Sequence, residues 1–217
     1  AGTNFWDAEG HVMSGSNDYP TRKVIMDWIA ANEKTLYLPR QAIKPIGIYF
    51  SNKTRDYFAD EFNKEYTGIM HLLLQGHQEF QVVTPRTLSG FGGEILILPD
   101  VKCLSAGEIS GLQQYKQKGG KFFVSGQSGT YDETGKNRPD NPLLALLGVP
   151  DAATRNIKTG EYIYDPALPA AAYLAAVRQG FDSTAWTGAD NEQLAKMRGD
   201  FLTSLTNDLK FEQAIQV

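Results

Sequence analysis

Short apolar runs alternate with longer amphipathic segments through the middle of the chain. Four runs have the length and composition of buried strands, and they are IGIYF (46–50), FQVV (80–83), EILIL (94–98) and KFFVS (121–125). Continuous apolar runs are typical of parallel strands covered on both faces, because a strand with one wet face alternates apolar and polar residues. The pattern therefore predicts a parallel β-sheet.

Helical patterns connect these runs. Phe62, Ile69 and Leu73 recur at helical spacing between the first two strands. Ser105 and Glu108 form a capping-box pair, in which each side chain bonds the other residue's free amide, and they open the helix before the fourth strand. Strands and helices in this order predict an α/β fold with helices on both faces of the sheet.

Right-handed crossovers bring the carboxyl ends of parallel strands to one edge of a sheet, so the turn at 125–129 is expected there. Two further helices are expected from PALPAAAYLAAVRQG and DNEQLAKMRGDFLTSLTNDLK, and EYIYD (161–165) is expected as an edge strand. Near the start of the chain, YPTRKVIMDWIAANEK predicts an amphipathic helix.

Composition narrows the functional classes. The 217 residues are 41% hydrophobic and include 11 Phe, 10 Tyr and 3 Trp, enough for a sizeable core. A net charge of −4 without a basic stripe argues against nucleic acid as a partner, and no apolar run approaches the roughly 18 residues of a membrane span. Cys103 is the sole cysteine and the three histidines form no ligand motif, so we expect neither a disulfide nor a metal or other cofactor.

Several consecutive motifs together resemble the middle domain of family 42-type β-galactosidases and related glycoside hydrolases. They are PIGIYFS, QVVTP, EILILPD, LSAGEISGLQQYKQKGGKFFVSGQSG and DETG, and they cover about residues 44–150. That module is known as the trimerisation domain and has the fold of class I glutamine amidotransferases. The resemblance implies a three-layer, flavodoxin-like sheet. It also implies a non-catalytic, self-associating role in a larger carbohydrate-cleaving enzyme.

The first residues extend the resemblance. GTNFWDAEGHVMSGSND, followed by a helix, looks like the last strand and helix of the TIM barrel that precedes this module in such hydrolases. The implied layout is a barrel remnant and linker at 1–43, an amidotransferase-like α/β domain at 44–160, and a helical extension at 161–217 leading to a further C-terminal region. The partners would be a second copy of the chain and the missing barrel, where Trp6 and Asp7 would border a sugar subsite.

Candidate nucleophiles lie near the predicted sheet edge. Class I amidotransferases carry a catalytic cysteine on the turn after a strand, and matching the Gly-Lys pair before that strand places Gln127 at its position. A carboxamide is no nucleophile at neutral pH. Ser128 comes one residue late for the Gly-x-Ser-x-Gly elbow, and no histidine follows residue 77 to act as its base. Cys103 precedes a helix N-terminus, where amides and Lys102 would lower the thiol pKa, yet it too lacks a histidine partner.

Asp132 and Glu133 form a carboxylate pair near the same edge, and glycosidases need two carboxyl groups that flank the scissile bond. Adjacent residues generally point apart, so a solvated loop, or a loop that caps a neighbouring subunit, is the structural alternative. Two other functions stay open. One is an independent amidotransferase-like or esterase-like hydrolase using Cys103 or Ser128, and the other is a carbohydrate-binding module using aromatic residues such as Trp186.

Overall fold

The computed structural model describes residues 19–38, 46–150, 154–182 and 192–211. The chain divides into two compact units, residues 1–42 and 43–217. The first unit contains the predicted N-terminal helix as α1 (Tyr19–Ala31), followed by the short helix α2 (Glu33–Leu36). No helix of the described segments is long and apolar enough to cross a membrane.

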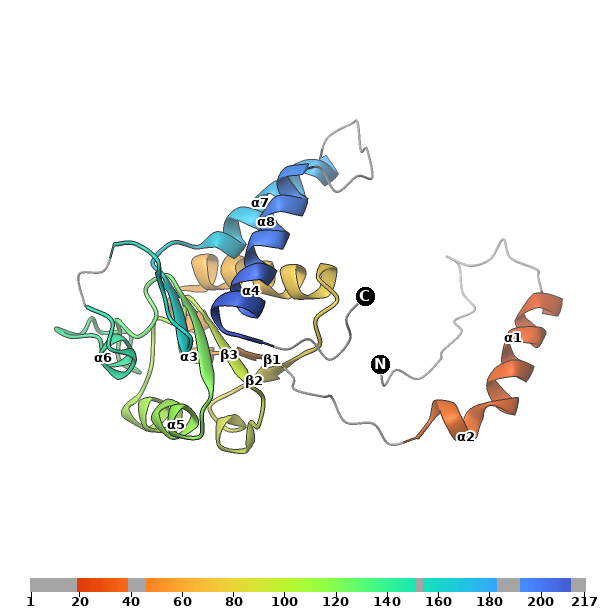
Figure 1. Ribbon diagram of the computed structural model, residues 1–217, viewed down its shortest axis with the longest axis horizontal. Coiled ribbons are helices and arrows are strands. Elements are labelled where there is room, and N and C mark those ends of the chain that lie inside the picture. The colour runs from red at the N-terminus through yellow and green to blue at the C-terminus, as the bar shows by residue number, and fades with distance from the viewer. Residues whose placement is uncertain (1–18, 39–45, 151–153, 183–191, 212–217) are drawn as a thin grey trace. The chain divides into compact units, whose positions relative to one another are not determined.

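The second unit is built on a six-stranded sheet. Its strands are β1 (Ile46–Tyr49), β2 (Phe80–Val83), β3 (Ile95–Pro99), β4 (Lys121–Ser125), β5 (Ile157–Lys158) and β6 (Tyr162–Asp165), in the order β2-β1-β3-β4-β6-β5 (Figure 1). All neighbours pair in parallel except β5 and β6. The predicted parallel sheet of four apolar runs is confirmed.

The prediction that residues 161–165 form an edge strand is wrong. Strand β6 pairs with β4 on one side and with β5 on the other, so the two-residue β5 forms this edge of the sheet and β2 the opposite one. The burial of Tyr162, Ile163 and Tyr164 follows from this interior position. The domain boundary expected at residue 160 lies between β5 and β6, inside the second unit.

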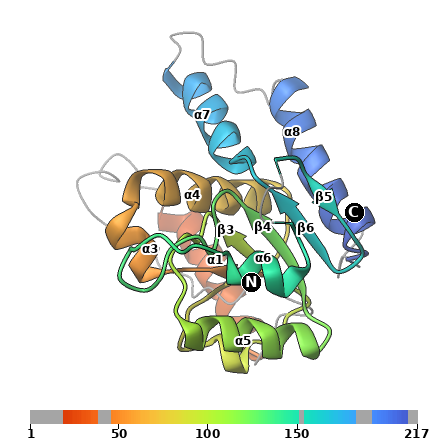
Figure 2. The ribbon, with the colours of Figure 1, turned by 90° about the vertical axis from the view of Figure 1, so that its left-hand side faces the viewer.

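Helices cover both faces of the sheet, as predicted. They are α3 (Asn52–Tyr57), α4 (Ala59–Gln75), the 3-10 helix η1 (Leu88–Gly90), α5 (Ala106–Gln117), α6 (Pro142–Leu147), α7 (Pro169–Asp182), α8 (Glu192–Thr203) and the π-helical turn η2 (Ser204–Asp208). Figure 2 shows α5 below the sheet and α4 above it. The fold is therefore a three-layer α/β sandwich.

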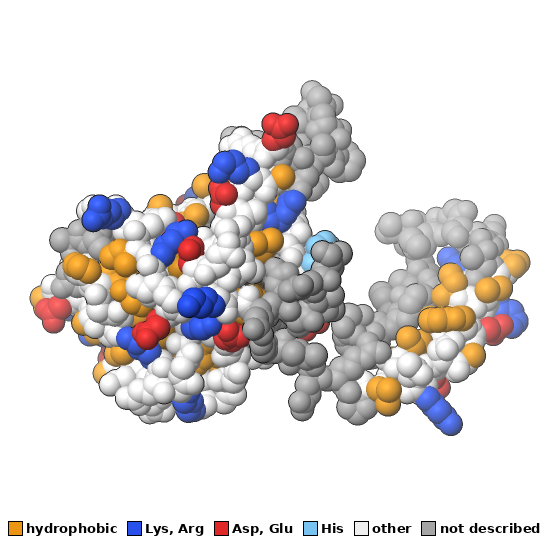
Figure 3. Space-filling model, viewed as in Figure 1, with side chains coloured by type: hydrophobic (Ala, Val, Ile, Leu, Met, Phe, Trp, Pro, Cys, Tyr) orange, Lys and Arg blue, Asp and Glu red, His pale blue; other side chains and the backbone are white. Residues whose placement is uncertain are grey.

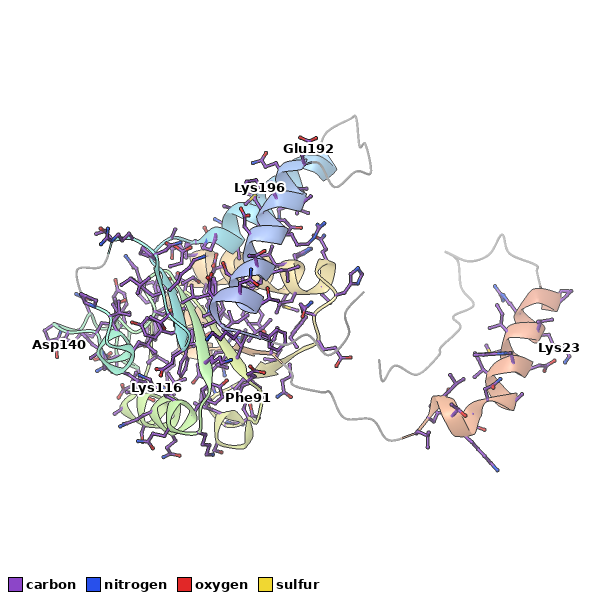
Figure 4. All side chains as sticks on the ribbon, viewed as in Figure 1. Lys23, Phe91, Lys116, Asp140, Glu192 and Lys196 are labelled. Carbon is purple, nitrogen blue, oxygen red and sulfur yellow. The ribbon has the colours of Figure 1, made fainter. Side chains whose placement is uncertain are left out.

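Alternate residues of the central strands β1, β3 and β4 pack into two separate cores, which explains why these strands read as continuous apolar runs. Leu96 and Leu98 pack in the core that contains residues of α5 and α6, whereas Ile95 and Ile97 pack in the core shared with α4, α7 and α8. Lys116 of α5, labelled in Figure 4, donates a 2.9 Å hydrogen bond to the carbonyl oxygen of Leu146 in α6. The predicted capping box is present at the start of α5.

Candidate functional site

The carboxyl ends of β3, β4 and β6 lie side by side at one edge of the sheet. The pairing register sets Pro99 beside Ser125 and Ser125 beside Asp165. The turn at 125–129 therefore lies at the edge where the sequence predicts it. This edge is the place where open parallel sheets usually bind ligands, so it is the candidate site.

The turn after β4 closes over a carboxylate. The backbone amide of Gln127 donates a 2.8 Å hydrogen bond to Oδ1 of Asp100, the residue that follows β3. Gly126 has a positive φ of 63°, and a Cβ there would lie 2.3 Å from the same oxygen, so this position requires glycine. The side chain of Gln127, at the expected nucleophile position, is exposed to solvent.

The hydroxyl group of Ser128 bonds to the backbone. Its Oγ accepts a 2.8 Å hydrogen bond from the amide of Val101 and lies 2.8 Å from the carbonyl oxygen of Ser125, to which it donates. The side chain is also buried, at 1% exposure. These contacts tie the turn to the loop after β3, and they describe a structural hydroxyl group.

Cys103 is buried as well. Burial raises the pKa of the thiol, and the nearby carboxylates of Asp132 and Glu108 raise it further, although Thr54 and Lys53 act in the opposite direction. The position before a helix N-terminus therefore does not lower this pKa, because desolvation outweighs the contributions of Thr54 and Lys53. Because the thiolate is the reactive form, Cys103 is not poised for nucleophilic attack.

Asp132 organises its own loop. Its Oδ1 accepts hydrogen bonds from the amide of Thr134 at 2.8 Å, from the Thr134 hydroxyl at 2.7 Å and from the amide of Lys136 at 3.0 Å. Bonds from Thr134 and Lys136 lower the pKa of Asp132. Glu133 is exposed and lies 3.9 Å from the guanidinium of Arg138. These contacts fit the loop alternative better than a glycosidase pair. The other candidates, Trp6, Asp7 and Trp186, lie outside the described residues.

A buried acid that sequence reasoning missed lies at this edge. Glu65 of α4 has no exposed surface, and its Oε2 accepts a 2.7 Å hydrogen bond from the amide of Ala171 in the first turn of α7. Burial raises the pKa of Glu65 to about 7; the bond from Ala171 and the nearby Ser125 hydroxyl lower it, while Asp100 and Asp165 raise it. The sequence feature that could have pointed to Glu65 is an acidic residue within the apolar stripe of a predicted helix, three residues after Phe62.

Two opposing effects act on the Glu65 carboxyl group, and their magnitudes show which one dominates. A helix N-terminus favours a nearby negative charge by about 0.3–1 kcal/mol. A rise in pKa from 4.5 to about 7 corresponds to roughly 3 kcal/mol against the ionised form. Desolvation therefore dominates, and near neutral pH a substantial fraction of Glu65 is protonated.

Asp100 is the second buried acid. Burial raises its pKa to about 6, opposed by the amide of Gln127 and by Lys102, and Glu61 adds a small further increase. Lys102 lies between two carboxylates, with its Nζ 3.6 Å from Asp100 Oδ2 and 3.3 Å from Glu61 Oε2. The backbone of Asp100 has a positive φ of 47°, a conformation that Asp and Asn tolerate better than most residues.

A cavity of about 280 Å³ lies in the second unit between the β5–β6 hairpin and helices α4, α7 and α8. Its apolar lining includes Leu72, Phe123, Ile163, Tyr173 and Phe201. Lys158, in the polar part of the lining, donates to Ser204 Oγ at 3.0 Å and to Asp208 Oδ2 at 2.8 Å. The cavity is therefore mainly apolar, and its one lysine is already engaged by protein groups.

The described residues contain no cluster of three His, Cys, Asp or Glu side chains that would hold a metal ion. Within those segments, the sheet edge offers two buried acids, the Ser128 hydroxyl group bonded to the backbone and the buried Ser125 hydroxyl group. These groups can exchange protons and hold loops together. The exposed side chain of Gln127, at the position where the sequence resemblance expects a nucleophile, is a carboxamide and is chemically inert.

No protein-family model and no curated protein matches the sequence. Solved structures do resemble its fold, and they include β-galactosidases. The β-galactosidase from the psychrophilic Marinomonas ef1 aligns with 83% of this chain and 33% of its own, at 13% identity and a TM-score of 0.50.

Two further structures are similar at lower scores. The β-galactosidase from Bacillus circulans sp. alkalophilus aligns with 61% of this chain and 21% of its own, at 12% identity and a TM-score of 0.49. The exo-carrageenase GH42 from Bacteroides ovatus aligns with 86% of this chain and 20% of its own, at 12% identity and a TM-score of 0.48. The chain thus spans between a fifth and a third of each of these proteins. At such identities, what this chain shares with the Marinomonas enzyme is the α/β fold.

Proposed function

We propose that this chain is a non-catalytic structural domain of a larger β-galactosidase-like glycoside hydrolase, and that it serves subunit association. The observation that carries the proposal is the turn after β4. It exposes Gln127 where an amidotransferase-like fold would carry its nucleophile, while Ser128 and Cys103 beside it are buried. The fold shared with a β-galactosidase over 83% of this chain supports the same assignment.

In this proposal, residues 1–43 derive from the end of a preceding barrel, and the trimerisation-type α/β domain begins at residue 44. The separation of residues 1–42 from the rest of the chain supports a boundary there. The active site of the parent enzyme would lie on the barrel, and the present domain would hold barrels together in an oligomer.

The surface of the first unit supports a role in association. Its helix α1 exposes large apolar side chains, with Val24 at 68%, Trp28 at 58% and Ile25 at 44% exposure (Figure 3). A helix of 13 residues is marginal in water by itself, because most helix stability comes from packing an apolar face. Exposed apolar groups of this kind favour a partner surface, and we propose a second copy of the chain.

Sedimentation of the full chain tests this function. We expect an oligomer at tens of micromolar concentration, and a shift toward monomer in a variant carrying Val24→Ser and Trp28→Ser. Leu74→Ser is the matched control, because Leu74 is an equally exposed apolar residue, at 59%, on α4 of the other unit. A wild-type chain that stays monomeric at high micromolar concentration would contradict the proposal.

Activity assays test the non-catalytic part of the proposal. The chain should hydrolyse neither glutamine, nor simple esters, nor aryl galactosides above background. Turnover that disappears in Cys103→Ala or Ser128→Ala would overturn this part of the proposal while leaving the association experiment to be judged by itself.

A further inference from the structure

Helix α7 packs its apolar side chains against α4, and one buried carboxyl group of α4 bonds to its first turn. Glu65 of α4 accepts the 2.7 Å hydrogen bond from the amide of Ala171, in the first turn of a helix that begins at Pro169. Three residues along α4, Gly68 approaches α7 so closely that a Cβ there would lie 2.0 Å from the carbonyl oxygen of Ala170. Glu65 therefore caps α7 from a neighbouring helix, at a crossing without spare room.

The second oxygen of this carboxyl group is buried without a hydrogen-bond partner. The Glu65 carboxyl group lies near the hydroxyl group of Ser125, at the end of β4, and this hydroxyl group is also buried and unpartnered. A carboxylate only accepts hydrogen bonds, whereas a protonated carboxyl group also donates one, and a hydroxyl oxygen accepts it. Either state permits one bond between the two groups, but the protonated state avoids burying a charge.

The charged groups around Glu65 come from three elements. Asp100 after β3 and Asp165 at the end of β6 both disfavour its ionisation, and Glu61 lies one turn earlier on α4. The cation among them is Lys102, which is shared between Asp100 and Glu61. The first turn of α7 adds no acidic residue, and Ser125 of β4 is neutral. The described surroundings of Glu65 are thus predominantly acidic.

We propose that Glu65 is a proton-binding site that couples the seating of α7 to pH: the protonated carboxyl group holds the first turn of α7 against α4 and β4, and loss of its proton loosens that helix. Pro169, Ala172 and Tyr173 of α7 also line the 280 Å³ cavity, so loosening of α7 widens that cavity.

The direction of the pH dependence follows from linkage. Burial raises the pKa of Glu65 from 4.5 to about 7 while α7 is seated, and the pKa returns toward 4.5 when α7 lifts and water reaches the carboxyl group. The packing of α7 against α4 and β4 is therefore most stable below about pH 4.5. The equilibrium constant for this packing falls about tenfold per pH unit between about pH 4.5 and about pH 7. Above about pH 7 it changes little.

NMR of the full chain tests the proposal over this pH range. The amide resonance of Ala171 should titrate with a midpoint near 7. Hydrogen-exchange protection of Tyr173 and Leu174 in α7, corrected for intrinsic exchange rates, should fall a few hundred-fold from about pH 4.5 to about 7. Protection of Leu112 and Tyr115, in α5 on the opposite face, should change much less.

Matched variants separate the effect of Glu65 ionisation from the effect of a changed side chain on packing. Glu65→Gln keeps an acceptor for the Ala171 amide and adds a donor for Ser125, so it should abolish the pH dependence of α7. Glu61→Gln changes an exposed acid on the same helix, so the pH dependence of α7 should remain. Asp100→Asn removes a repelling charge and should move the Ala171 midpoint to lower pH.

Three results would overturn the proposal. They are an Ala171 resonance that does not titrate, an equal loss of protection in α5 and α7, and a pH dependence that persists in Glu65→Gln. If Glu65→Gln does not fold, the wild-type and Asp100→Asn titrations decide, and an unmoved midpoint counts against the proposal.

Discussion

Replacing Gly68 with alanine tests the close crossing of α4 and α7. A Cβ atom at residue 68 would lie 2.0 Å from the carbonyl oxygen, 2.4 Å from the carbonyl carbon and 3.0 Å from the Cβ of Ala170. Non-bonded carbon atoms prefer separations of about 3.5–4.0 Å, so α7 must move away by roughly 1–1.5 Å. Backbone atoms cannot turn aside as a flexible side chain can.

The expected loss of stability combines two effects. Overpacking in a close-packed interior costs about 1–3 kcal/mol, and a displaced α7 also lengthens the bond between Glu65 and Ala171. Alanine offsets part of this loss, because it is favoured over glycine in a helix interior by about 1 kcal/mol. We expect Gly68→Ala to lower the free energy of unfolding by about 1–3 kcal/mol in total.

Urea unfolding followed by circular dichroism measures this difference. Gly199→Ala is the matched control, because Gly199 lies inside α8 and a Cβ there meets no atom within 4 Å. Helix propensity then acts alone, and this variant should be about 0.5–1 kcal/mol more stable than the wild type. A Gly68→Ala chain as stable as the Gly199→Ala chain would refute the close crossing.

Two further predictions concern the sheet edge. Burial raises the pKa of Asp100 from 3.8 to about 6, so the free energy of unfolding should fall by up to roughly 3 kcal/mol from about pH 4 to about 6. Asp100→Asn, which tolerates the same backbone conformation, should lose this part of the pH dependence in urea titrations, and identical pH profiles would contradict the assignment. Cys103 should react with a disulfide reagent such as dithionitrobenzoate only as the chain unfolds, and rapid labelling of the native protein at neutral pH would show an accessible thiol.

Local patterns predicted most of the sheet. The run at 121–125 coincides with β4, because a parallel strand covered on both faces must be apolar along almost its whole length. The run at 80–83 coincides with β2, although β2 lies at an edge of the sheet and exposes Gln81 and Val82. The two residues of β5 carry too short a pattern to be recognised. The position of β6 inside the sheet depends on which strands pair across long stretches of chain, and no local pattern encodes that order.

The sequence by itself determined the fold class, the turn that follows β4, and the inert Gln127 at its tip, because these depend on residue type and short-range spacing. Tertiary structure alone decided the state of the buried groups. Asp100, Ser125 and Glu65 are far apart along the chain, and folding brings them to one edge of the sheet where water is excluded. The pKa of a carboxyl group depends on its desolvation and on the charges around it, so the titration of Glu65 and Asp100 near neutral pH is a property of the packed molecule.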